Sequence, residues 1–280
     1  MSSPDNSEGA WSSAYRFVAS EKWKAKSAAM GRQVTEALVD YARPTSGMKV
    51  LDLASGTGEP AITLASRIGP EGNVTALDLS AGLLQIAAER AQQRGLTNFL
   101  TRQADAQLLP FPDQSFDLVT CRFGVMFFTD VAQALREARR VLKPGARACF
   151  LAWGPFEQPY WLSMMGVVVR HVGGPAIAPG GADPFRFSAP GSLSAALQTA
   201  GFCDVEEETR TLPWTWPGPA EEVWEQAQAV SAPFLPLLQR IPAAKRGEID
   251  RDVLRAIQQY AQGEEIKFGA TVVLASGQKQ

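Results

Sequence analysis

The sequence predicts an α/β fold in which helices cover both faces of a parallel sheet. Between residues 48 and 153, short apolar runs alternate with longer amphipathic stretches, the pattern of consecutive βα units. The first run leads into a glycine-rich turn, and the chain of 280 residues is 45% hydrophobic and 20% charged, as in globular proteins. Right-handed crossovers should bring the carboxyl ends of the strands to one edge, where ligands usually bind.

Five strands and three helices are expected in this region. The strands are short apolar runs at residues 48–54, 74–79, 99–103, 116–121 and 146–153. The helices are expected at residues 59–68, from Ser80 to about Gly95, and at 130–142. Ser80 can cap the second helix, and Lys143-Pro144-Gly145 should stop the third before the next strand begins.

The flanking segments add helices and two further strands. One or two helices are expected over residues 10–43 and an apolar helix over 160–172, followed by a loop rich in glycine and proline at 173–190. A short helix at 192–200 and a strand at 203–212 follow. Residues 218–262 should be mostly helical with breaks at prolines, and the chain closes on a strand at 266–275.

Composition argues against several classes of protein. The formal net charge of −2 disfavours a protein that binds nucleic acid through its phosphates. Cys121, Cys149 and Cys203 are scattered and His171 is the single histidine, so no metal ligand set is expected. Since the start of the chain lacks the features of a signal peptide and no apolar run could span a bilayer, we expect a cytoplasmic protein without a membrane span.

The turn after the first strand is the first candidate for ligand binding. Gly56, Gly58 and Ala61 satisfy the loose glycine pattern of dinucleotide-binding folds, although a plain strand-to-helix turn would satisfy it too. Asp52 lies inside the preceding strand, where a dinucleotide fold normally has an apolar residue. A carboxylate at the end of a buried strand needs a partner, such as loop amides or a ligand ammonium.

Two more acids follow the next two strands. Asp78 lies 22 residues after Gly56, where an acid accepts hydrogen bonds from both ribose hydroxyls, or alternatively caps the helix at Ser80. Asp105 follows the third strand, where it could accept from the exocyclic amine of an adenine or simply stabilise a surface turn. Three acids at successive strand ends favour a cofactor that carries a nucleoside.

Four segments in order resemble the motifs of class I S-adenosylmethionine-dependent methyltransferases: VLDLASGTGEPA, ALDLS, ADAQLLPFPDQSFDLV and RVLKPGAR. They are most similar to the branch that includes the ubiquinone and menaquinone biosynthesis C-methyltransferases. The resemblance covers about residues 45–153, with Ala54-Ser55 where glycine and cysteine are commoner. It implies a doubly wound, seven-stranded, mostly parallel sheet in the order 3-2-1-4-5-7-6, with strand 7 antiparallel.

The resemblance also implies the residues around the methionine part of S-adenosylmethionine. Ala54, Gly56 and Gly58 would offer their backbone to it, while Asp52 would support this loop and face the ammonium group. Arg122, just after the fourth strand, would lie near the same end of the cofactor.

At the nucleoside end, the resemblance assigns four residues. Asp78 would accept from the ribose hydroxyls and Leu79 would pack on the adenine. Asp105 and the Ala106 amide would bind the adenine edge.

In domain terms, residues 1–44 would form a helical segment that covers the site, and 45–280 the methyltransferase domain. The last two strands of the family's sheet would be 203–212 and 266–275. Cap segments would occupy about residues 156–190 and 213–265.

Methyl transfer needs no catalytic dyad, and the sequence shows none. A general base is required only if the acceptor loses a proton, and His171 is the candidate, although a histidine at a helix C-terminus is more often structural. Tyr15 and Tyr160 are weaker candidates, for which packing is favoured.

Five tryptophans fall in or beside the expected cap: Trp153, Trp161, Trp214, Trp216 and Trp224. They could line an apolar acceptor pocket or simply pack the cap. The sequence therefore favours a methyltransferase that uses S-adenosyl-L-methionine, with S-adenosyl-L-homocysteine as product, on a small hydrophobic or aromatic acceptor. The alternatives are a non-catalytic protein that binds S-adenosylmethionine and a nicotinamide-dependent dehydrogenase.

Overall fold

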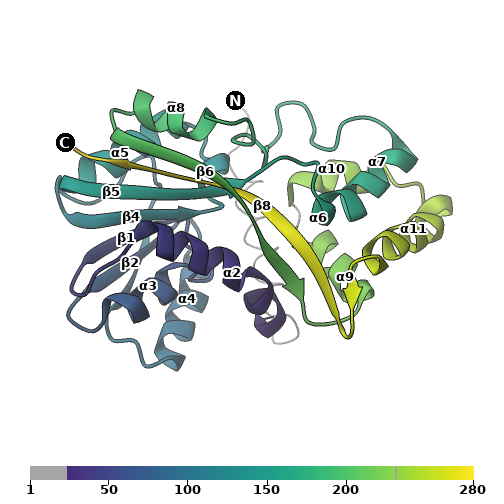
Figure 1. Ribbon diagram of the computed structural model, residues 1–280, viewed down its shortest axis with the longest axis horizontal. Helices are drawn as coiled ribbons and strands as arrows, with labels where there is room; N and C mark the ends of the chain where they lie inside the picture. Colours follow the sequence, from purple (N-terminus) through teal and green to yellow (C-terminus); the bar gives the residue numbers. More distant parts are fainter. Residues whose placement is uncertain (1–23, 231) are drawn as a thin grey trace. The chain divides into compact units, whose positions relative to one another are not determined.

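A mostly parallel sheet with the strand order β3-β2-β1-β4-β5-β8-β6 organises the chain, and the short β7 pairs with β8 (Figure 1). The computed structural model describes residues 24–230 and 232–280. Within these residues the strands are β1 (Lys49–Leu53), β2 (Asn73–Asp78), β3 (Phe99–Gln103), β4 (Phe116–Arg122), β5 (Leu142–Trp153), β6 (Cys203–Trp216), β7 (Ala261–Gln262) and β8 (Glu265–Gln278). With β8 as the seventh long strand, this is the predicted order.

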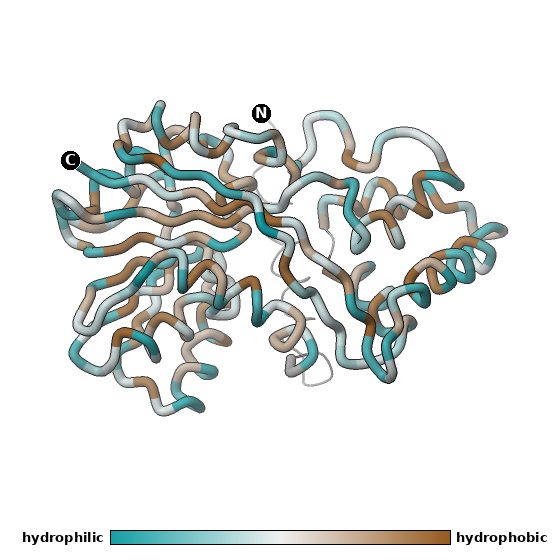
Figure 2. The backbone as a smooth tube through the Cα atoms, viewed as in Figure 1, coloured by the Kyte–Doolittle hydropathy of each residue, from teal (hydrophilic) through white to brown (hydrophobic). Residues whose placement is uncertain are grey.

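The pairing directions agree with the predicted fold. β1 pairs in parallel with β2 and β4, β2 with β3, and β4 with β5, whereas β8 runs antiparallel to β5. The inner strands β1 and β4 are almost wholly buried, as expected when helices cover both faces of a parallel sheet. In Figure 2 these inner strands are largely hydrophobic. β3, at the edge of the sheet, is mostly exposed.

The helices that follow the first strands form for local reasons. α3 (Ala61–Ile68) packs on β2, and α4 (Ala81–Gln93) packs on β2 and β3. Ser80 caps α4 as predicted, because its hydroxyl accepts from the Leu83 amide at 3.4 Å. α5 (Val131–Val141) is capped in the same way by Asp130, which accepts from the Gln133 amide at 2.9 Å.

The predicted start of the fifth strand was wrong. α5 ends at Val141, and β5 begins at Leu142, so the Lys143-Pro144-Gly145 stop lies inside the strand. The β4–β5 register shifts between Phe116 and Leu118, and the Gly145 amide donates instead to the Lys279 carbonyl at 2.7 Å. Proline is tolerated at such an irregularity because its missing N–H breaks no ladder bond there.

The remaining helices agree with the predicted helical segments but divide them more finely. The helix expected at 160–172 contains a π-helical turn, Leu162–Gly166, between α6 (Pro159–Trp161) and α7 (Val167–Val172). The others are α2 (Lys24–Ala42), α8 (Ser192–Thr199), α9 (Ala220–Val230), α10 (Leu235–Gln239) and α11 (Arg246–Gln258). The earlier part of the helical segment expected at 10–43, with Tyr15, lies outside the described residues.

The chain divides into two compact units. Unit 1 contains Pro155–Asp183, Thr211–Thr271 and the described part of Met1–Val34. Unit 2 contains Thr35–Gly154, Pro184–Arg210 and Val272–Gln280. The long strands β6 and β8 contribute residues to both units; β6 continues past its predicted end at 212, and β8 extends beyond both of its predicted ends. Among the helices that the structure describes, none is both long and apolar enough to cross a membrane.

Candidate functional site

The carboxyl edge of the unit 2 sheet brings the sequence-predicted residues together. Parallel pairing of β1 with β2 and β4, and of β2 with β3, aligns the ends of four strands. Asp78 ends β2 and Arg122 ends β4, while Asp105 follows β3. Asp52 lies one residue before the end of β1, so all four residues share this edge.

The loop after β1 has an unusual backbone. Ala54, Gly56 and Gly58 adopt positive φ angles of 53°, 53° and 107°. The Ser55 amide donates to the Leu77 carbonyl at 2.9 Å, and the Gly58 amide donates to the Ser55 carbonyl at 2.8 Å. Ala54 is costly in this conformation because its Cβ crowds the backbone, and such strain is typical of functional loops.

The two glycines have different surroundings. Beyond its two neighbours in the chain, no residue has an atom within 4 Å of the position that a Cβ on Gly56 would take, so a ligand can approach the backbone on this side. A Cβ on Gly58 would lie 2.6 Å from the Ile62 Cδ1 and 3.1 Å from the Ala87 Cβ. Gly58 therefore permits close packing of the loop on α3 and α4, whereas Gly56 presents open backbone.

Asp52 is completely buried and holds the loop from beneath. Its Oδ2 accepts from the Ser55 hydroxyl at 2.6 Å, and its Oδ1 accepts from the Thr120 hydroxyl of β4 at 2.7 Å. Burial raises the pKa of Asp52 to about 7, although the two hydroxyl bonds and the nearby Arg122 act in the opposite direction. The partners of this carboxylate are thus two side-chain hydroxyls, rather than the loop amides that the sequence suggested.

Asp78 connects the glycine loop to the start of α4. Its Oδ2 accepts from the Gly56 amide at 2.9 Å, and its Oδ1 accepts from the Ser80 amide at 2.9 Å. The second bond is the local contact expected of an acid beside a helix cap. The first joins β2 to the loop after β1, which local sequence could not reveal.

The residues beyond Asp78 form the other half of the edge. Leu79, the residue directly after β2, is 52% exposed. The Asp105 carboxylate accepts from the Gln107 backbone amide at 2.8 Å and from the Gln107 side chain. Asp105 therefore stabilises a turn, which is the alternative role that the sequence left open. Ala106, the next residue, is buried.

Arg122 and its neighbours end β4 with a second strained turn. The Arg122 guanidinium donates to the Thr35 hydroxyl of α2 at 3.0 Å and lies over the Phe123 ring. Phe123 has a positive φ of 58° and stacks on Trp153 with ring centroids 4.5 Å apart. A non-glycine residue with this backbone at a strand end suggests a functional constraint.

Sequence reasoning missed two residues that support the glycine loop. A Cβ on Gly124 would lie 2.5 Å from the Ala54 Cβ and 2.9 Å from the Cys121 Sγ, so only glycine lets the two loops approach. Arg90 of α4 donates to the Thr57 carbonyl and lies 3.7 Å from the Glu59 carboxylate. Neither residue belongs to a local motif, so no pattern in the sequence marks them.

The predicted base lies in unit 1. His171 of α7 contacts Asp252 of α11, with Nε2 and Oδ2 2.9 Å apart. Tyr160 is buried beside Trp161, Trp214 and Phe268, and burial raises the pKa of its hydroxyl, so packing describes it better than base catalysis.

The tryptophans of the expected cap are packing residues in this structure. All five are buried, namely Trp153, Trp161, Trp214, Trp216 and Trp224. The indole of Trp224 donates to Asp250 at 2.9 Å, and that of Trp216 donates to Glu222 at 3.1 Å. Of the two alternatives, packing is therefore the one that the described structure supports.

Comparison with known proteins identifies relatives of the first half of the chain. The model of the ubiE/COQ5 methyltransferase family matches residues 23–165. The ubiquinone/menaquinone biosynthesis C-methyltransferase UbiE of Xanthomonas oryzae pv. oryzae is 50% identical over 111 residues, which are 39% of this chain and 44% of that one. The demethylmenaquinone methyltransferase of Listeria welshimeri is 39% identical over 130 residues, 46% of this chain and 55% of that one. The match thus spans about half the length of these relatives.

Solved structures agree on the fold. The Bacillus YcgJ protein superposes with a TM-score of 0.58 at 22% identity, covering 88% of this chain and 97% of that one. A phosphoethanolamine N-methyltransferase of Haemonchus contortus superposes with a TM-score of 0.56 at 17% identity, covering 96% and 60%. Since the family model matches about half of the chain, in the segment that forms the glycine loop and β1 to β5, the chain belongs to the ubiE/COQ5 methyltransferase family.

Proposed function

We propose that this protein is a methyltransferase that uses S-adenosyl-L-methionine to methylate a small hydrophobic or aromatic acceptor. The observation that carries the proposal is the bond between the Asp78 carboxylate and the Gly56 amide, which joins two cofactor motifs at one sheet edge. Family membership supports the same chemistry.

The nucleoside of the cofactor would lie along the β2 and β3 ends. A carboxylate can accept about four hydrogen bonds, so the amide bonds to Asp78 are compatible with two ribose hydroxyls binding from solvent. The exposed Leu79 would gain an apolar partner if an adenine covered it. Asp105 and the Ala106 amide would bind the adenine edge, with Gln107 orienting the Asp105 carboxylate.

The methionine part would lie against the open backbone at Gly56. The positive φ angles of Ala54 and Gly58 shape this loop. Asp52 is fully buried and both of its oxygens accept hydroxyls, so it would fix the loop through Ser55 rather than contact the ammonium group. Arg122, held by Thr35, would place its cation near the carboxylate end. The sulfonium of the cofactor supplies the reactive methyl group, so these residues bind and orient rather than react.

A general base is needed only for an acceptor that must lose a proton. His171 with Asp252 has the arrangement of an imidazole oriented by a carboxylate, and its role as the base stays a prediction.

The acceptor is proposed on chemical class alone. The relatives named above methylate ubiquinone and menaquinone precursors according to their names, so aromatic and quinone-type rings are the first acceptors to test. The balanced charge of the chain favours such a small molecule over a nucleic acid.

Calorimetric titration with S-adenosylhomocysteine, alongside NADH and NADPH, tests the cofactor class. Micromolar binding of S-adenosylhomocysteine, about −8 kcal/mol, without a dinucleotide signal would support the proposal. Binding of a dinucleotide alone would replace it with a dehydrogenase. Binding without turnover across a broad acceptor panel would favour the non-catalytic alternative.

Substitution of Asp78 tests whether S-adenosylhomocysteine binds at the sheet edge that contains this residue. Asp78→Asn keeps the shape and one acceptor oxygen, yet loses charge-assisted bonds that are each worth roughly 1.5–3 kcal/mol, so affinity should fall about tenfold or more. Glu71→Gln, an exposed acid just before β2, is the matched control and should bind normally. Unchanged affinity in Asp78→Asn would remove Asp78 from the cofactor site.

A further inference from the structure

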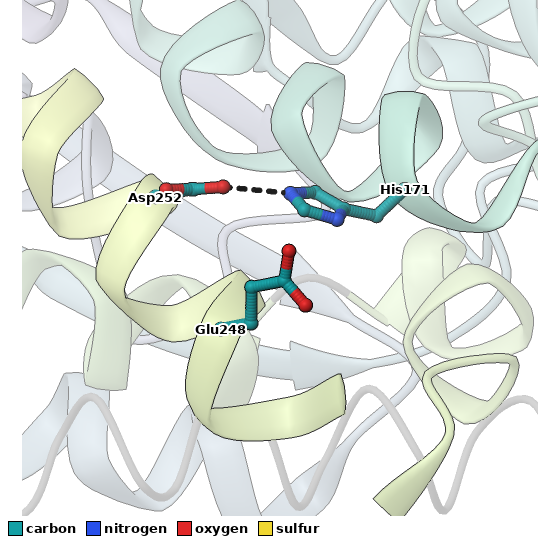
Figure 3. Close-up of side chains that lie close together, drawn as sticks. All are labelled: His171, Glu248 and Asp252. Atoms are coloured by element: carbon teal, nitrogen blue, oxygen red, sulfur yellow. Dashed lines mark hydrogen bonds and ion pairs between the residues drawn. The ribbon is translucent and has the colours of Figure 1, made fainter. Parts of the chain in front are cut away.

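Three side chains that can ligate a metal converge in unit 1, whereas the sheet-edge residues discussed above belong to unit 2. His171 extends from α7 toward two carboxylates of α11, Glu248 and Asp252 (Figure 3). One possible ligand atom from each of the three side chains lies within 4.8 Å of the other two. Among the residues that the structure describes, no other group of three histidine, cysteine or acidic side chains lies this close together.

The two helices hold this arrangement in place. Glu248 and Asp252 are four residues apart on α11, so they lie one turn apart on the same face of the helix. Ile249, Val253 and Ile257 are buried at the same spacing on the inner face, and Figure 2 shows the resulting mixture of hydrophobic and hydrophilic residues along α11. Packing of α11 against α7 therefore positions the carboxylates beside His171.

The cluster holds two carboxylates beside one imidazole, one more acid than a simple ion pair needs. His171 needs one carboxylate as a partner and has Asp252 at 2.9 Å, yet Glu248 brings a second negative charge to the same imidazole. Arg255 contacts the other oxygen of Asp252 at 3.1 Å, the position that an outer partner of a metal-binding carboxylate takes. A dication among the three groups would offset the repulsion between the two acids.

The distance between His171 and Asp252 is close to the ligand spacing of a metal ion with nitrogen and oxygen ligands, and Glu248 lies within 4.8 Å of both. Ligands at about 2.1 Å from a tetrahedral zinc ion lie about 3.4 Å apart, so the His171 and Asp252 atoms would separate by about half an ångström to admit it. Glu248 is exposed and Asp252 is half-buried, which leaves an entry path and room for water as a further ligand.

We propose that His171, Glu248 and Asp252 form a binding site for one divalent transition metal ion of the zinc class, which clips α7 to α11. Three protein ligands leave at least one coordination position for water. A metal bound to Nε2 occupies the lone pair that would accept a proton. Metal binding and the predicted role of His171 as a general base therefore exclude each other. Spacing of cysteine and histidine could not reveal the cluster, because its carboxylates lie some eighty residues further along the chain.

Titration of the untagged, metal-free full-length protein with Zn²⁺ tests the site without using methyl transfer. We expect one ion per chain, and Co²⁺ should give the intense visible absorption of a four- or five-coordinate ion. Glu248→Gln and Asp252→Asn should each weaken binding by at least about tenfold, a loss seen even for outer partners of metal ligands. Glu221→Gln, an exposed acid on α9, is the matched control and should bind as the parent chain does.

Three results would overturn the proposal. These are the absence of stoichiometric Zn²⁺ binding, equal binding by Glu248→Gln and the parent chain, or only the weak absorption of hexa-aqua Co²⁺. Since the Glu248 side chain is exposed, its substitution should leave the circular dichroism spectrum unchanged. Failure of the metal titration would leave cofactor binding at the unit 2 edge untouched, so the two proposals fail separately.

Discussion

At the residue scale, two acids of the sheet edge act in different ways. Asp52 is enclosed and receives hydroxyl bonds from Ser55 and Thr120, so it fixes the glycine loop to β4. Asp78 is half-buried and receives amide bonds, so its carboxylate is oriented while remaining accessible. The enclosed acid stabilises the loop, and the accessible one is suited to a ligand.

The burial of Asp52 predicts a pH-dependent cost to stability. Its pKa is about 7 in the folded chain against an ordinary 3.8, so between these values the folded chain holds the extra proton and the free energy of unfolding falls as pH rises. Asp52→Asn keeps the size and removes this titration. Relative to Asp52→Asn, the parent chain should lose stability from pH 5 to pH 8, by at most roughly 3 kcal/mol, because about two pH units of the window lie below the folded-state pKa.

Urea unfolding of both proteins at pH 5 and pH 8 measures that difference. Because other groups titrate equally in the two proteins, the parent-minus-variant difference isolates Asp52. If the free energy of unfolding changed equally with pH in both proteins, burial would not raise the pKa of Asp52.

At the element scale, the turns after β1 and β4 depend on each other. Ala54 and Phe123 both adopt positive φ, and Gly124 lies where its missing side chain lets these turns touch. The stacking of Phe123 on Trp153 then joins the β4 turn to the end of β5. The shape of the candidate site is thus set by pairs of neighbouring turns rather than by one motif.

Gly124→Ala tests this dependence. The added Cβ would meet the Ala54 Cβ and the Cys121 Sγ at 2.5 and 2.9 Å, an overpacking that should destabilise the protein by about 1–3 kcal/mol and weaken S-adenosylhomocysteine binding. Gly247→Ala, in a helix where the nearest contact is the flexible end of Arg251 at 3.7 Å, should be neutral or slightly stabilising. Thermal unfolding of both variants measures the difference in stability. Equal melting temperatures for Gly124→Ala and Gly247→Ala would contradict the coupling of the two turns.

At the scale of the whole molecule, the family match and the two units divide the chain differently. The matched segment, residues 23–165, contains β1 to β5 and hence the candidate cofactor residues. Thr211–Thr271 of unit 1 lies outside it. We therefore expect the cofactor class to follow the family and the choice of acceptor to depend on residues beyond the match.

Much of the unit 2 sheet could be predicted from sequence because its strands are apolar runs bounded by turn residues. β3 and the Ser80 cap were predicted at their observed positions, since both depend on local pattern. The start of β5 was missed because Gly145 pairs with Lys279, far along the chain. Gly124, Arg90 and Glu248 were missed for the same reason, since their importance lies in long-range contacts.

The measurement that tests the central claim most directly is transfer of an isotope-labelled methyl group from S-adenosylmethionine to a panel of aromatic, quinone-type and other hydrophobic acceptors. The proposed function predicts that labelled acceptor and S-adenosylhomocysteine form in equal amounts, and that Asp78→Asn slows both while Glu71→Gln does not. If S-adenosylmethionine binds but neither product forms with any acceptor, the protein is a binding protein and the catalytic claim is contradicted.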